Sequence, residues 1–129
     1  MAGKNKNTKD VTYQQGTIIR STGSWYDILA EDDKVYKGRL RGKFKIKGIK
    51  ATNPIAVGDN VSFFSEDTEE STVVINSIED RDNYIIRQST HKKGHIHIIA
   101  SNLDQAVLIA TISMPRTSLG FIDRFLVSC

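Results

Sequence analysis

The chain has 129 residues, enough for one domain with a hydrophobic core or for one small domain and part of another. Its hydrophobic share of 39% and charged share of 26% are typical of globular proteins and argue against a disordered or fibrous chain. No apolar run approaches the roughly 20 residues that span a bilayer, and residues 1–10 lack the apolar segment of a secretory signal. The single cysteine, Cys129, has no disulfide partner in the chain, so we expect a cytoplasmic protein without membrane association.

Residues 1–10 are rich in Lys and Asn, and we predict that they form a flexible basic tail. After them, short runs alternate polar and apolar residues and are separated by Gly, Asn and Asp, which is typical of antiparallel strands. Turns are expected at residues 22–24, 32–33 and 57–59. The predicted strands cover residues 12–21, 25–30, 35–41, 60–65 and 72–78.

Five short strands in one basic module predict an all-β fold over residues 11–80, a closed Greek-key barrel of the oligonucleotide-binding (OB) type. A small SH3-like barrel is the alternative. The acidic residues 66–71 are interpreted as a solvated hairpin loop.

The basic residues concentrate in residues 34–50, which contain eight Lys and Arg side chains and no acid. Alternation along an extended strand would place five of these cations on one face, where they could follow the phosphates of RNA and release counterions. A lysine-rich edge that only prevents strand aggregation is the alternative. The predicted RNA-binding residues are Arg39, Arg41, Lys43, Lys45 and Lys47.

Aromatic residues could add base stacking to such a surface, and the candidates are Trp25, Tyr26, Tyr36 and Phe44. In a barrel this small, large aromatic side chains supply much of the core. We therefore expect Trp25 to belong to the core and do not count it among the binding residues.

The pattern changes after the barrel. Residues 81–96 are interpreted as a linker, and residues 97–129 as the start of a second domain. The apolar run of residues 106–111 predicts a strand buried on both faces of a parallel sheet, and Thr117-Ser118 could cap a helix with an apolar face formed by Phe121, Ile122, Phe125 and Leu126. One strand and one helix are not a domain, so we expect the chain to be part of a longer protein. The alternative is that the helix packs back onto the barrel.

His91, His95 and His97 have a spacing that could suggest a metal site, but no fourth ligand lies nearby and two lysines follow His91. The sequence contains no G-x-x-x-x-G-K-[ST] loop for a triphosphate, and no nucleophile has an identifiable base. We therefore expect no catalytic, nucleotide-binding or metal-binding residue in this stretch.

Six strings, in order along the chain, closely resemble the circularly permuted, ribosome small subunit-dependent GTPases. They are STGSWYDI (21–28), GRLRGKFK (38–45), GIKATNPIAVGDNV (48–61), RDNYIIRQS (81–89), HIIASNLDQAVLIAT (97–111) and TSLGFIDRFLV (117–127). One departure is Gly38, where the family would lead us to expect a Cys or a similar residue.

The resemblance implies an OB barrel, followed by the truncated start of an α/β P-loop-type GTPase domain with permuted motifs, and a zinc-binding domain further on. It implies a monomeric protein that uses GTP with Mg and a structural Zn, binds the small ribosomal subunit and its rRNA, and acts in late maturation of that subunit. The guanine-reading and phosphate-binding motifs would follow Cys129, so this stretch alone is expected to be inactive. A free-standing, non-enzymatic RNA-binding module is the alternative.

Overall fold

The computed structural model describes residues 11–40, 53–66, 72–88 and 93–129. The chain divides into two compact units, the first formed by Met1–Phe44 and Asn60–Asp80 and the second by Lys45–Asp59 and Arg81–Cys129. Each unit is described by itself.

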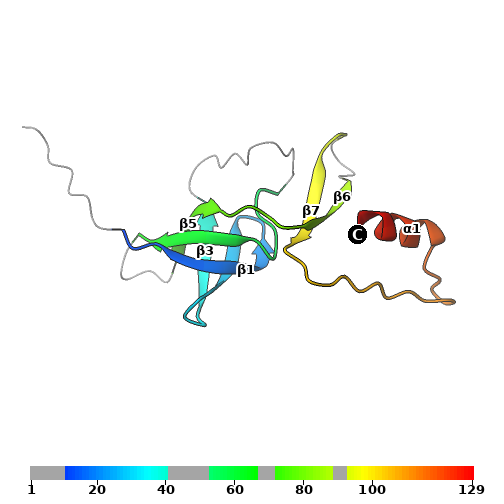
Figure 1. Cartoon of the computed structure of the whole chain (residues 1–129), viewed down its shortest axis with the longest axis horizontal. Helices are drawn as coiled ribbons and strands as arrows, with labels where there is room; N and C mark the ends of the chain where they lie inside the picture. The colour runs from blue at the N-terminus through cyan, green and yellow to red at the C-terminus, as the bar shows by residue number, and fades with distance from the viewer. Residues whose placement is uncertain (1–10, 41–52, 67–71, 89–92) are drawn as a thin grey trace, which may run out of the picture. The chain divides into compact units, whose positions relative to one another are not determined.

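The first unit is a closed five-stranded barrel with the strand order β1-β2-β3-β5-β4 (Figure 1). β3 and β5 run parallel, whereas the other neighbouring strands are antiparallel. This order confirms the predicted OB-type barrel. The strands are β1 (Gln14–Thr22), β2 (Trp25–Ala30), β3 (Val35–Leu40), β4 (Asn60–Ser65) and β5 (Thr72–Ile78).

The barrel closes because β1 pairs with two strands at once. Gly16 lies opposite Ala30 on β2 and opposite Val61 on β4. A Cβ atom at Gly16 would lie 2.7 Å from the carbonyl oxygen of Leu29, so the close approach of β1 to β2 at this point requires glycine. A register shift between Ile18 and Arg20 further bends β1.

The barrel core consists of the inward-facing residues of the alternating strands. Ile18, Ile28 and Val61 are fully buried, and Phe63 and Ile75 are nearly so. Removing this apolar surface from water is the main term that stabilises the barrel.

The predicted strands match the observed ones within two residues at each end. Two of the predicted turns contain residues with positive φ within the first unit, Gly23 (61°) and Asp33 (59°). Gly and Asp adopt this left-handed conformation more readily than most residues, which explains why the chain turns at these two predicted positions.

The second unit contains an antiparallel hairpin of β6 (Tyr84–Gln88) and β7 (Ile96–Ser101). The sequence analysis did not predict either strand. Next to β7 lies the segment around Val57, which forms a parallel bridge to Ala100.

Residues 106–111 were predicted to be a buried strand, and this prediction is wrong. The segment has no regular secondary structure, with Val107 and Ile109 exposed by 78% and 86%. A strand of a parallel sheet needs hydrogen-bonded neighbours, and no strand of the described residues pairs with this segment.

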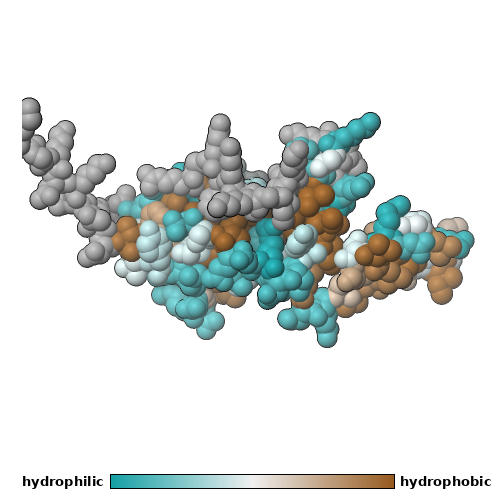
Figure 2. Space-filling view, turned by 45° about the horizontal axis from the view of Figure 1, so that its top comes forward, coloured by the Kyte–Doolittle hydropathy of each residue, from teal (hydrophilic) through white to brown (hydrophobic). Residues whose placement is uncertain are grey.

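The predicted helix is confirmed as α1 (Leu119–Ser128). Ser118 is its N-cap, and its Oγ accepts a hydrogen bond of 3.2 Å from the N–H of Phe121. None of its residues is buried, and Figure 2 shows hydrophobic surface over the helix. Within the described part of the chain, no helix is long and apolar enough to cross a membrane.

Candidate nucleic-acid interface

The outer face of the sheet formed by β1, β2 and β3 carries two cross-strand rows of polar and aromatic side chains. In one row, Arg20 lies opposite Asp27, which in turn lies opposite Lys37. In the other row, Trp25 lies between Thr22 on β1 and Arg39 on β3. We call these six residues the outer face of the barrel.

The alternation of β2 explains why these residues face outward. Tyr26, Ile28 and Ala30 are buried at alternating positions, so the intervening Trp25 and Asp27 point away from the core. On β3, Gly38 is buried while Lys37 and Arg39 are exposed.

The ion pairs of the outer face are weak and accessible. Arg20 lies 3.9 Å from Asp27, and Arg39 lies 3.6 Å from Glu66, with the two arginine side chains 71% and 53% exposed. Exposed pairs of this kind contribute about 0–1 kcal/mol, so a phosphate could replace the carboxylate at little cost. Lys37 has no ion pair among the described residues.

Of the five predicted RNA-binding residues, the structure places Arg39 on the outer face, near the end of β3. The basic stretch continues directly from there in the sequence. Arg41, Lys43, Lys45 and Lys47 lie outside the described residues, and so does Phe44. The patch as a whole stays a prediction.

The expectation that Trp25 belongs to the core is wrong, because this residue is 41% exposed, whereas its neighbour Tyr26 is only 3% exposed. The alternation of polar and apolar residues in the sequence already indicated that Trp25 faces solvent. Trp25 has the same alternation phase as Asp27, and a carboxylate marks the solvent face of a half-buried strand. Burial raises the pKa of the Tyr26 hydroxyl, as expected for the inward face.

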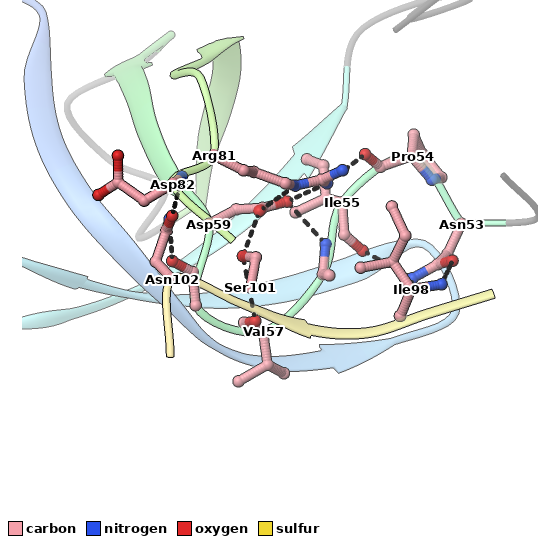
Figure 3. A network of polar contacts seen from close by, with 12 residues as sticks. Asn53, Pro54, Ile55, Val57, Asp59, Arg81, Asp82, Ile98, Ser101 and Asn102 are labelled. Atoms are coloured by element: carbon pink, nitrogen blue, oxygen red, sulfur yellow. Dashed lines mark hydrogen bonds and ion pairs between the residues drawn. The ribbon is translucent and has the colours of Figure 1, made fainter. Parts of the chain in front are cut away.

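The second unit contains a buried polar network centred on Asp59 (Figure 3). Its fully buried carboxylate accepts two hydrogen bonds from Arg81, one of 2.8 Å from the N–H of Ala56, and one of 2.5 Å from the hydroxyl of Ser101. The hydrogen bonds to Asp59 raise the pKa of Arg81 above its usual value, against the opposing effect of burial. We call Asp59, Arg81 and Ser101 the carboxylate clamp.

Backbone contacts extend the clamp. Gly58 has a φ of 93°, and a Cβ there would lie 2.0 Å from the carbonyl oxygen of Ser101, so only glycine fits. The Asn53 side chain donates to the carbonyl of Ile98 (2.8 Å) and accepts from its N–H (3.1 Å), as a neighbouring strand would. No buried side-chain nitrogen or oxygen of the described residues lacks a hydrogen-bond partner, so the polar groups of the clamp are satisfied.

His95 lies directly before β7 and His97 is its second residue, whereas His91 lies outside the described residues. No group of three metal-ligating side chains occurs in the parts of the chain that the structure describes. The sequence also lacks a phosphate-binding loop. We assign no ligand of GTP, Mg or Zn to the described residues.

A barrel with this strand order, followed by a hairpin and a capped helix, defines an OB-type module joined to the elements of a further domain. Comparison with known families gives both parts a name. The family model described as RsgA N-terminal domain matches residues 15–73, and the one described as RsgA GTPase matches residues 78–129. The chain belongs to the RsgA family of circularly permuted GTPases, which confirms the resemblance found in the sequence.

Individual relatives agree. The chain is 56% identical over 115 residues to the small ribosomal subunit biogenesis GTPase RsgA of Christiangramia forsetii, covering 88% of this chain and 36% of that protein. It is 51% identical over 115 residues to the protein of the same name in Cytophaga hutchinsonii, covering 89% and 38%. The chain thus spans little more than a third of the length of these relatives.

Two solved structures share the fold. The crystal structure of YjeQ from Thermotoga maritima matches with a TM-score of 0.55 and 27% identity, covering 90% of this chain and 36% of that one. The structure of YloQ, described as a circularly permuted GTPase, matches with a TM-score of 0.54 and 28% identity, covering 98% and 38%.

Proposed function

We propose that this chain is the rRNA-binding part of a GTPase that acts in late maturation of the small ribosomal subunit. The observation that carries the proposal is the outer face of the OB-type barrel, where Lys37 and Arg39 lie on neighbouring exposed positions beside an acid-free basic sequence. The names of the relatives supply the subunit and the GTPase activity.

The barrel would dock the protein on rRNA and so position a GTPase domain on the subunit. Salt-sensitive contacts between Lys or Arg and phosphates suit this role, because they supply affinity without demanding a particular sequence. The cations proposed to make them are Arg39, Arg41, Lys43, Lys45 and Lys47, the last four by sequence alone.

GTP with Mg, and a structural Zn, are proposed for the longer protein, with their ligands beyond the residues of this chain. We also propose a cytoplasmic monomer and a domain boundary near residue 80, where the barrel ends. The alternative of a free-standing RNA-binding module is disfavoured, because the RsgA GTPase model matches residues 78–129.

The test is a salt-dependent pull-down of the chain with purified small and large ribosomal subunits. We expect selective retention of the small subunit, with log K falling linearly as log salt concentration rises. Replacing Arg39, Arg41 and Lys43 together by Ala should make this dependence on salt less steep, by about 0.7–0.9 units of slope for each phosphate that is no longer bound.

The matched control replaces Arg116 and Arg124, two exposed cations of the second unit that belong neither to the basic stretch nor to the outer face of the barrel, by Ala. It should leave the salt slope unchanged. Equal retention of both subunits, or an unchanged slope in the triple variant, would refute the docking role of the patch.

A further inference from the structure

The sole tryptophan of the chain lies in an unusual position for so large an apolar side chain. Trp25 is the first residue of β2, follows the tight turn at Gly23, and is 41% exposed. Its backbone is held by the strand pairing and by a 3.4 Å hydrogen bond that the Thr22 hydroxyl donates to its carbonyl oxygen. The indole therefore projects from a strand whose backbone is fixed at this residue.

Nothing in the described part of the chain covers the exposed side of this indole. The ring contacts found there join Tyr13 to Phe64 and Tyr36 to Phe63, and Trp25 takes part in neither. Its indole N–H also has no hydrogen-bond partner among the described residues. The turn before it is open, since a Cβ at Gly23 would meet no atom within 4 Å.

A cation stands next to the indole. Arg39 lies directly opposite Trp25 in the pairing of β2 with β3, and directly opposite residues have their Cβ atoms roughly 4.5–5.5 Å apart. Its side chain is 53% exposed, and its ion pair with Glu66 is an exposed one of 3.6 Å. The aromatic ring of Trp25 and the guanidinium of Arg39 are therefore close enough for one to contact the base and the other the phosphate of a nucleotide.

We propose that Trp25 stacks on an unpaired base of the RNA whose backbone phosphate is bound by Arg39. This inference rests on the proposed function and adds the kind of RNA that the barrel selects. A duplex keeps its bases stacked on one another, whereas a single strand or a loop can offer a base face to an aromatic side chain. The barrel should therefore favour unpaired RNA over a duplex of equal charge.

The test uses the intrinsic fluorescence of Trp25, which has no tryptophan background in this chain. The whole chain is titrated with a short single-stranded RNA and with a duplex of equal phosphate number, while anisotropy of labelled RNA measures binding independently. We expect saturable quenching by the single strand with the Kd that anisotropy gives, and weaker binding with little quenching by the duplex.

Variants separate stacking from charge. Trp25→Ala should weaken binding of the single strand by about 5- to 150-fold and leave the salt slope unchanged, because it removes a stacked base and no phosphate contact. Trp25→Phe should retain most of the affinity. Leu29→Ala, an exposed residue on the same face of the same strand, is the matched control and should bind as the wild type does.

The outcomes distinguish the inference from the function on which it rests. Salt-sensitive RNA binding without quenching, and with Trp25→Ala binding normally, would overturn the stacking role and leave RNA binding intact. Loss of subunit binding but not of RNA binding in Trp25→Ala would instead assign the indole to a ribosomal protein and also overturn it. Absence of any RNA binding would overturn both. If Trp25→Ala does not fold, the inference is tested by the fluorescence quenching of the wild type and by the RNA affinity of Trp25→Phe.

Discussion

Arg81 holds the carboxylate of Asp59 with two hydrogen bonds of 2.6 Å, one from Nε to Oδ1 and one from Nη2 to Oδ2. The two side chains are 8% and 0% exposed, so both charges are largely removed from water. Removing one of them would leave the other buried without compensation.

Asp59→Ala and Arg81→Ala are each expected to lower the free energy of unfolding by about 3–5 kcal/mol. Thermal or urea unfolding followed by circular dichroism would measure the loss. The double variant should lose less than the sum of the two single losses, because the residues belong to one network. Arg124→Ala, at an exposed position on α1, is the control and should change little. Strictly additive losses would show that the clamp does not act as a unit.

Gly58→Ala should destabilise the second unit far more than Gly23→Ala destabilises the first. Both glycines have positive φ, 93° and 61°, so both substitutions incur about 1–2 kcal/mol of backbone strain. Only at Gly58 would the new methyl group meet backbone, the carbonyl of Ser101. Chemical denaturation of the two variants side by side tests this difference, and equal losses would show that the close approach is relieved without cost.

Tyr36 should ionise at higher pH than an ordinary tyrosine. Its hydroxyl donates a hydrogen bond of 3.0 Å to Asp32, and this bond to the carboxylate raises the pKa of Tyr36. Because the folded-state pKa is raised, the resulting stabilisation is fully present below the unfolded pKa of about 10 and is lost as pH rises through the folded value.

Ultraviolet absorbance of tyrosinate during an alkaline titration measures this ionisation, and Tyr36→Phe identifies the contribution of Tyr36. Asp32→Asn should lower the pKa of Tyr36. Asp33→Asn is the control, because Asp33 makes no hydrogen bond to Tyr36. An identical titration in Asp32→Asn would contradict the role of the hydrogen bond.

GTP should not stabilise this chain. A ligand raises Tm only if it binds the folded state, and the sequence has no phosphate-binding loop. A thermal unfolding series with increasing GTP and Mg should give a constant Tm, while a single-stranded RNA should raise it. A dose-dependent increase with GTP would reveal a nucleotide site within these residues.

The barrel was predictable because its information is local. The alternation of β2 and the turn residues Gly23 and Asp33 set strand limits within a few positions, and closure follows from having to hide strand edges. Trp25 was misplaced because its size was given more weight than its alternation phase.

The second unit was less predictable because its determinants are distant in sequence. The turn at Gly58 and Asp59 could be seen, but the partners of that carboxylate lie 22 and 42 positions further on, at Arg81 and Ser101. Residues 106–111 were judged by apolar run length alone, and no strand of the described residues supplies the neighbours that such a run would need.

The carboxylate clamp also has an evolutionary consequence. Any single substitution of Gly58, Asp59 or Arg81 would give a less stable protein. We therefore expect evolution to replace these residues together and not one at a time. Homologous sequences should therefore keep the glycine, the two charges and the Ser101 hydroxyl as a set or replace them as a set. That correlated pattern would identify the second unit in distant relatives whose overall identity has decayed.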